Sequence, residues 1–373
     1  MVIMALDHVR MYFGYGTWYA EPTNLSTTTP LLFFTRWVTH FCAPVFVFLA
    51  GTSAFLYGRK MSNVKQIAWY LFTRGLWLVV VEIMIVTFGW TFDITFSFII
   101  LQVIWAIGIS MIVLSAFVFL PMQIIFAIGI ILVFGHNLLD PIHLQRESFP
   151  DILWYVLHQP QRVILNHRMI TIVYPVLPWI GLMSLGSVFG NLFQREFPTE
   201  QRTRWLLAGG FGAIILFLVL RSFNLYGEPI DWQKHDSNIY TLMSFLNTTK
   251  YPPSLQFLLM TMGPALLFLA WSERIRGENP FMVFGRVPFF FYIIHIYFIH
   301  ALAVLSLIYA GWNWKEYILS EQRMVSGRLS HFGFGLGAVY MIWLVVVALL
   351  YPLCIWYQKV RGNHPTRWWL KYL

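Results

Sequence analysis

Charged residues are scarce in this sequence. Asp, Glu, Lys and Arg together make up 11% of its 373 residues, whereas about a quarter is usual in a soluble globular domain. Hydrophobic residues reach 58% and aromatic residues 18%, so apolar side chains must face lipid as well as one another. This composition excludes a soluble globular protein and predicts a polytopic integral membrane protein.

Cysteine is also rare. Cys42 lies in the second apolar segment and Cys354 near the end of the last, and we expect them to lie too far apart for a disulfide. Neither has Cys or His neighbours at the spacing of a zinc site, so no metal is predicted. No soluble domain, low-complexity tract or removable signal peptide is visible. The sequence therefore predicts a single transmembrane domain that comprises residues 1–373.

Hydrophobic runs predict an all-α bundle of about ten transmembrane helices. The first run ends near Gly14, short of the roughly 20 residues that cross a bilayer, so we expect this helix to be truncated at its N-terminus. The other predicted spans are 38–57, 67–88, 96–120, 122–139, 170–192, 205–220, 254–271, 287–309 and 332–357.

Basic residues predict the orientation of the bundle. Segments 58–66, 193–204, 272–286 and 358–373 contain 13 Lys and Arg in 52 positions, whereas the alternate loops contain 10 in 115. Because Lys and Arg stay on the cytoplasmic side, both termini are predicted to be cytoplasmic, in a bacterial inner membrane. The net charge of +9 then reflects topology and contact with anionic membrane lipid, and no nucleic-acid partner is expected.

Ionisable and polar residues within apolar helices are the candidates for function, because a charge there costs several kcal/mol unless it faces a cavity or a partner. Most of them gather toward the predicted outer side, which indicates a water-accessible, outward-facing cavity. Arg36 and His40 are four residues apart and share a helix face. The candidates are Asp7, His8, Arg36, His40, Glu82, Gln102, His136 and His295.

Packing explains several of these residues equally well. A lone intramembrane histidine can bond a backbone carbonyl, which is the favoured interpretation of His295 and His300. His136 with Asp140 suits a helix-end cap, and Glu82 with Gln102 suits an interhelical hydrogen bond. Adjacent ionisable residues are harder to explain by packing, so His8 is interpreted as a proton acceptor oriented by the neighbouring carboxylate, Asp7.

Segments 4–10, 35–51, 251–254 and 284–292 resemble the bacterial relatives of heparan-alpha-glucosaminide N-acetyltransferase, in the wider transmembrane acyltransferase superfamily. The Pro-x-Phe-Val-Phe-x-x-Gly element beginning at Pro44 is the most specific part of the likeness. The resemblance implies a membrane enzyme that takes acetyl-CoA from the cytoplasmic side. The acetyl group would pass to a sugar amine or hydroxyl on the other face.

The resemblance also implies roles for single residues. His8 matches the first-helix histidine of the superfamily, whose arginine partner would fall upstream of Met1. The lysosomal relative has asparagine at the position resembling Asp7 and a catalytic histidine in the following loop. No histidine occurs here between Val9 and Thr39, so His40 is the second candidate.

The predicted reaction is direct transfer, with His8 and Asp7 as the catalytic pair and an acetyl-histidine intermediate as an alternative. The predicted acceptor-binding residues are Arg36, Glu82, Gln102, His136 and His295. The CoA phosphates are assigned to Arg59, Lys60, Arg74 and Arg286, although inner-surface cations are expected in any case. The alternative function is a transporter or flippase for a sugar or lipid-linked glycan. Glycine-rich helix faces permit a homodimer.

Overall fold

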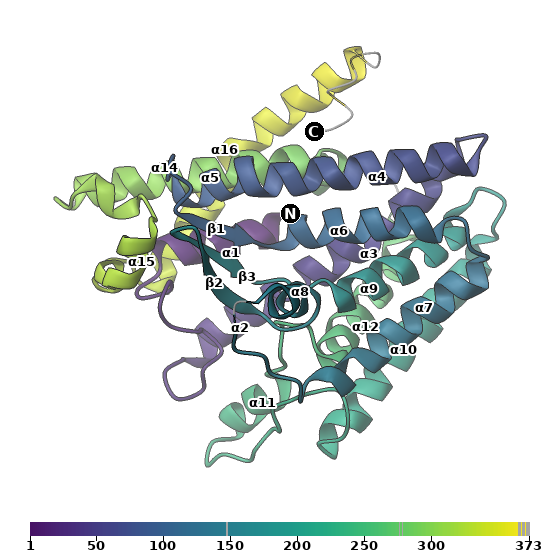
Figure 1. The fold of residues 1–373 in the computed structure, drawn as a ribbon, viewed down its shortest axis with the longest axis horizontal. Helices are drawn as coiled ribbons and strands as arrows, with labels where there is room; N and C mark the ends of the chain where they lie inside the picture. The colour runs from purple at the N-terminus through teal and green to yellow at the C-terminus, as the bar shows by residue number, and fades with distance from the viewer. Residues whose placement is uncertain (147, 276, 278, 365–366, 368–369, 371–373) are drawn as a thin grey trace.

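The chain is mostly helical, as predicted. The computed structural model describes residues 1–146, 148–275, 277, 279–364, 367 and 370 (Figure 1). Within these residues, seven helical segments are long and apolar enough to cross a membrane. They are α2 (Pro30–Thr39) with α3 (Cys42–Gly58), α4 (Val64–Val81) with the π-helical η1 (Glu82–Val86) and α5 (Thr87–Thr91), α7 (Met122–Gly135) with η2 (His136–Leu139), α10 (Thr199–Ser222), α12 (Leu255–Ser272), α14 (Pro288–Tyr309) and α16 (Leu336–Asn363).

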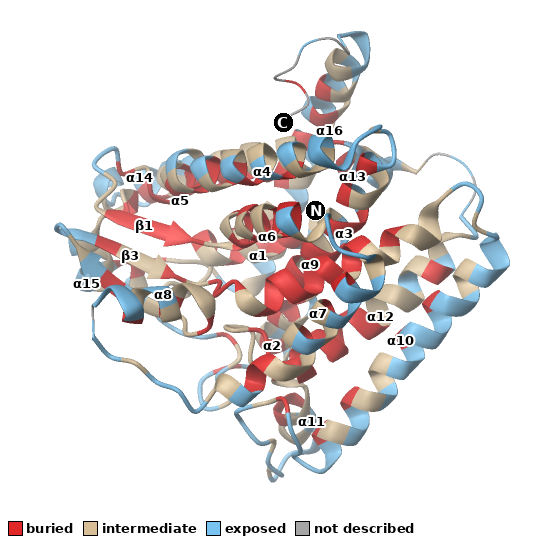
Figure 2. Ribbon diagram, turned by 45° about the vertical axis from the view of Figure 1, so that its right-hand side comes forward, coloured by how far each residue is buried: buried red, intermediate tan, exposed pale blue. Residues whose placement is uncertain are grey.

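Three other predicted spans contain shorter helices. These are α1 (Val2–Phe13), α6 (Val103–Phe117) and α9 (Leu177–Phe189), the last followed by η3 (Gly190–Phe193). Figure 2 shows α9 as a largely buried helix inside the bundle, whereas α10 exposes much of its length. Seven spans are therefore supported by length and composition, and both the total of about ten and the orientation of the termini stay predictions.

A small sheet corrects the all-α prediction. Its order is β1 (Phe98–Leu101), β3 (Arg168–Ile172) and β2 (Gln161–Leu165), with β1 parallel and β2 antiparallel to β3. The predicted spans 96–120 and 170–192 each begin as one of these strands, because a short apolar run does not distinguish strand from helix. Asn166 and His167, both with positive φ, form the two-residue turn between β2 and β3.

The remaining elements connect the long helices. One side of the sheet contacts α8 through a small apolar cluster that contains Tyr155, Val163 and Ile172. Figure 1 shows α8 beside the sheet and α11 at the far end of the molecule. The connecting elements are α8 (Phe149–Leu157), α11 (Asn238–Leu246), α13 (Pro280–Arg286), η4 (Trp314–Tyr317), α15 (Glu321–Ser326) and η5 (Arg328–His331).

Two glycines allow α3 and α9 to pack with their backbones almost in contact. A Cβ atom at Gly51 would collide with the carbonyl oxygen of Met183, and one at Gly186 with the carbonyl oxygen of Phe48. Thr52 adds a hydrogen bond from its hydroxyl to the Gly186 carbonyl at 2.9 Å. Small residues at helix contacts are a general way to bring membrane helices together. Gly51 is the last residue of the Pro-x-Phe-Val-Phe-x-x-Gly element, so that element owes its glycine to helix packing.

Candidate functional site

A cavity of about 270 Å³ lies where α1, α2 and the sheet come together. Four of the predicted site residues line it, namely Asp7, His8, Arg36 and Gln102. They come from α1, α2 and the residue before α6, so the fold brings together side chains separated by almost 100 residues. The lining also includes Arg10, Trp18, Glu21, Thr39, Trp90, Arg162, Thr171, Tyr174, Lys250, Tyr251 and Tyr292.

His8 is held by a second histidine. Its Nδ1 lies 2.7 Å from Nε2 of His295, on α14, and the two rings are stacked with their centroids 4.9 Å apart. Trp90 packs edge-on against the His8 ring at 4.7 Å. These contacts fix both the position and the plane of the imidazole within the cavity wall.

The hydrogen bonds of His295 also determine which nitrogen of His8 carries a proton. His295 Nδ1 lies 2.9 Å from the carbonyl oxygen of Phe291, which only accepts, so this nitrogen is the donor. In a neutral imidazole the other nitrogen, Nε2, is then an acceptor. His8 must therefore donate through Nδ1, and its Nε2 keeps an unshared electron pair. A neutral histidine in this tautomer can act as a general base.

Asp7 is bound to two arginines. Its carboxylate accepts a hydrogen bond from Arg10 at 2.9 Å and from Arg36 at 2.5 Å, and the structure shows no hydrogen bond between His8 and Asp7. The predicted orientation of His8 by Asp7 is therefore replaced by orientation through His295. Asp7 and Arg36 instead join α1 to α2, and Arg36 is 8% exposed, so this is a largely desolvated ion pair.

The cavity carries more positive than negative charge. Arg10, Arg36, Arg162 and Lys250 line it, against the carboxylates of Asp7 and Glu21. Burial alone would raise the pKa of the Tyr251 phenol, but the cations of Lys250 and Arg36 lower it below its usual value. Sequence reasoning missed Lys250, although this lysine directly precedes the segment 251–254 that carries part of the family resemblance.

Four of the eight candidates lie outside the cavity lining, namely His40, Glu82, His136 and His295. His40 is 4% exposed, packs against Phe257 with ring centroids 5.4 Å apart, and follows directly after the cavity residue Thr39. Glu82 is fully buried, and its carboxylate accepts hydrogen bonds from the backbone N–H groups of Gln102 at 3.0 Å and Trp105 at 3.1 Å. This carboxylate therefore caps the N-terminus of α6, which supports its packing interpretation.

Histidines on other helices have distinct surroundings. His295 bonds a backbone carbonyl, as its packing interpretation predicted, and it also contacts His8. His300 lies 2.8 Å from the carbonyl oxygens of both Gly89 and Tyr317, so its predicted backbone bonding is confirmed. His136 is not part of the cavity lining. It lies next to Asp140 and His158.

The residues predicted to hold CoA phosphates lie on three segments. Arg59 and Lys60 are exposed in the turn between α3 and α4. Arg74 on α4 places its guanidinium carbon 5.7 Å from the Phe289 ring centroid. Arg361 donates a hydrogen bond to the carbonyl of Arg286 at 2.7 Å, which adds a cation that sequence reasoning missed. Arg59, Lys60, Arg74 and Arg286 lie outside the cavity lining, and their role stays a prediction.

A protein-family model matches the part of the chain that contains most of the cavity-lining segments. The family model described as "Heparan-alpha-glucosaminide N-acetyltransferase, catalytic" matches residues 2–226, more than half of the chain. This range contains Asp7, His8, Arg36 and Gln102, whereas Lys250 and His295 follow it. No curated protein and no solved structure matches the chain. The chain therefore belongs to the heparan-alpha-glucosaminide N-acetyltransferase catalytic family, as its sequence resemblance predicted, and is an integral membrane protein of the acetyltransferase type.

Proposed function

We propose that this protein transfers an acetyl group from cytoplasmic acetyl-CoA to a sugar amine or hydroxyl bound in the cavity, with His8 as the general base. The observation that carries the proposal is the His8–His295 pair. Its geometry leaves Nε2 of His8 as a proton acceptor on a cavity wall. The family match supports the class of reaction. The setting is one transmembrane domain in a bacterial inner membrane, with both termini cytoplasmic.

The proposed reaction is a direct transfer. His8 Nε2 takes the proton of the acceptor amine or hydroxyl while the acceptor atom attacks the thioester carbonyl carbon. The carbon–sulfur bond then breaks, and the departing CoA thiolate takes up the proton from His8. Fixing the base and the two reactants in one small site supplies proximity as well as proton transfer.

The charges of the cavity suit such a step. Negative charge develops on the thioester oxygen in the transition state, and cations such as Lys250 in the cavity wall stabilise it. The ion-paired Asp7 keeps Arg10 and Arg36 in place, while Gln102 offers an amide to acceptor hydroxyls. Arg59, Lys60, Arg74, Arg286 and the neighbouring Arg361 are assigned to the CoA phosphates.

Release of free CoA by the purified chain in detergent tests the function. Acetyl-CoA is supplied with a panel of amino sugars and neutral sugars, and acceptor-dependent CoA release is expected. His8→Gln should lower the rate by about 100-fold or more, the usual contribution of a general base. His143→Ala, which changes an exposed loop histidine, should leave it unchanged.

Two outcomes would overturn the proposal. The first is that folded, monodisperse protein releases no CoA with any acceptor, while sugar enters proteoliposomes in the absence of acetyl-CoA. This result would indicate the alternative function, a transporter. The second is full activity in His8→Gln, which would remove the base from this site.

A further inference from the structure

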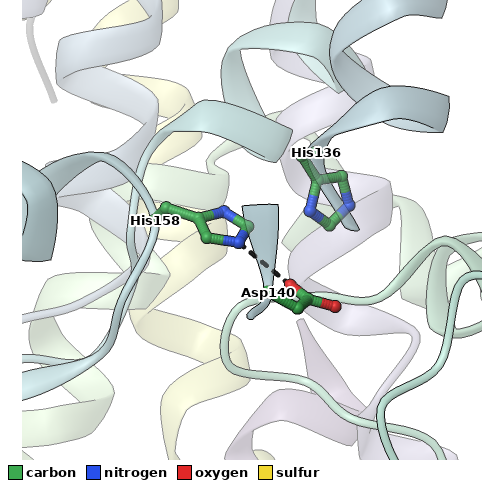
Figure 3. A group of neighbouring side chains, drawn as sticks. All are labelled: His136, Asp140 and His158. Atoms are coloured by element: carbon green, nitrogen blue, oxygen red, sulfur yellow. Dashed lines mark hydrogen bonds and ion pairs between the residues drawn. The ribbon is translucent and has the colours of Figure 1, made fainter. Parts of the chain in front are cut away.

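Three side chains of types that can bind a metal ion, His136, Asp140 and His158, lie close together (Figure 3). None of them lines the cavity. His136 begins η2, Asp140 follows the end of η2, and His158 follows the end of α8. His158 Nε2 lies 2.9 Å from Asp140 Oδ1, and the two imidazole rings have centroids 5.6 Å apart. One ligand atom from each residue lies within 4.8 Å of the other two.

His136 lacks the partners that a buried imidazole needs. The residue is 2% exposed, and neither ring nitrogen has a hydrogen-bond partner among the described residues. His158 Nδ1 is likewise without one. Leaving a buried polar group without a partner is energetically unfavourable. The unpartnered imidazole of His136, next to Asp140 and Nε2 of His158, therefore points to a bound species that accepts an electron pair.

The ligand atoms match a divalent transition metal. Two imidazole nitrogens and one carboxylate oxygen are preferred zinc ligands, and metal bonds of about 2.0–2.1 Å place tetrahedral ligands about 3.3 Å apart. The present separations bracket that value, so small side-chain rotations suffice. We propose that His136, Asp140 and His158 bind a zinc-class divalent ion, with a water molecule as the fourth ligand.

Neighbouring groups prepare the carboxylate for this role. Asn137 donates a hydrogen bond to Asp140 Oδ2 at 2.8 Å, and its own oxygen accepts the backbone N–H of Leu255 at 2.9 Å. Asn137 thus links the carboxylate of Asp140 to the start of α12 and holds it in orientation, as outer-shell groups do in metal sites.

The position of the site indicates what the ion does. His158 lies four residues before Arg162, which is on β2 and lines the cavity. An ion bound to His136 and His158 joins the end of α7 to the segment that leads into this strand. The metal therefore braces one wall of the cavity and takes no part in the transfer reaction.

Zinc titration of the full chain tests the site. Tag-free protein in detergent is stripped with EDTA, dialysed, and titrated with ZnCl₂ by calorimetry. One equivalent is expected to bind. His136→Ala or His158→Ala should weaken zinc binding by at least about 10- to 100-fold, because each removes a direct ligand and loss of an outer-shell partner alone has that effect. His143→Ala changes an exposed histidine of the same loop and should bind zinc as the native chain does.

Cobalt substitution and X-ray absorption of the native chain provide a readout that needs no variant. Tetrahedral Co²⁺ absorption and a zinc edge with two histidine ligands are expected. The proposal is overturned if the stripped chain takes up no stoichiometric Zn²⁺, if the bound zinc shows no histidine ligation, or if folded His136→Ala binds zinc as tightly as the native chain. If only a water molecule occupies the space between the three side chains, the stripped chain will take up no stoichiometric Zn²⁺.

Discussion

At the scale of single residues, the cavity depends on partners that are distant in the sequence. His8 and His295 are separated by 287 positions and share a hydrogen bond, while Asp7 and Arg36 are separated by 29. A histidine acts as a base only in the correct tautomer, and here a backbone carbonyl determines that tautomer through His295. In the proposed reaction, His295 is therefore a positioning residue for His8.

Replacing His295 is expected to impair the transfer reaction through His8. His295→Leu removes the acceptor for His8 Nδ1, so the imidazole of His8 can adopt the other tautomer. We expect kcat to fall by about 10- to 100-fold, because part of the rate enhancement that a general base provides is lost. His295→Gln places an amide oxygen near the lost nitrogen and should restore much of kcat. KM for acetyl-CoA should stay constant in both variants. An equal loss in both variants would contradict the tautomer argument.

Removing Asp7 is expected to destabilise the fold. Asp7→Ala leaves Arg10 and Arg36 buried without their shared carboxylate, and loss of one member of a buried ion pair costs about 3–5 kcal/mol. Thermal unfolding in detergent should show a clearly lowered Tm. Arg328→Ala breaks the exposed pair with Glu316, in which the arginine is 70% exposed, and should leave Tm nearly unchanged. Equal Tm values for the two variants would contradict the role assigned to Asp7.

At the scale of secondary-structure elements, backbone contacts position the helices around the cavity. The contact of α3 with α9 requires Gly51 and Gly186, since a side chain at either would meet a backbone carbonyl. Glu82 caps α6 through the backbone N–H groups of Gln102 and Trp105. The cap places the start of α6, and with it Gln102, at the cavity wall.

A matched pair of Gly→Ala substitutions tests the contact between α3 and α9. Gly186→Ala should lower stability by about 1–3 kcal/mol, the usual result of overpacking, because its methyl group meets the Phe48 backbone. Gly212→Ala adds the same methyl group on α10, where nothing lies within 4 Å, and should be neutral or slightly stabilising since alanine favours helix. Thermal unfolding of both variants in detergent measures the difference. A Gly186→Ala protein as stable as Gly212→Ala would refute the close approach.

At the scale of the whole molecule, charge and apolar surface indicate how the bundle sits in the membrane. Large apolar side chains such as Trp69, Phe211 and Met341 are exposed on α4, α10 and α16, which suits contact with lipid. The basic segments alternate along the chain, so the turn between α3 and α4 is predicted on the cytoplasmic side and the segment around α11 on the other.

Sided cysteine labelling tests this orientation. Ser62→Cys and Ser237→Cys both place a thiol at an exposed position, in a background with Cys42→Ser and Cys354→Ser. A membrane-impermeant maleimide should label the Ser237→Cys protein in intact cells and the Ser62→Cys protein only after the membrane is opened. The reverse pattern would invert the predicted topology.

Local pattern was sufficient for some features and not for others. The long apolar helices could be predicted because length and hydropathy belong to single segments. Residues 98–101 and 170–172, at or near the starts of the predicted spans 96–120 and 170–192, lie in strands, because β1 pairs with β3 about 70 positions along the chain. In the site, Asp7, His8, Arg36 and Gln102 were found as polar residues in apolar surroundings, whereas Lys250 lies in a loop where a lysine carries no such signal.

The sequence by itself determined the class of this protein: a scarcity of charge and long apolar runs require a membrane environment, and short local motifs identify an acetyltransferase family. Only the tertiary structure decided which side chains meet. It paired His8 with His295 and Asp7 with Arg36, and it brought His136 and Asp140 to His158. The physical reason is that composition and motifs are properties of neighbouring residues, whereas hydrogen bonds, ion pairs and metal-ligand groups depend on distances that the packing of helices and strands creates.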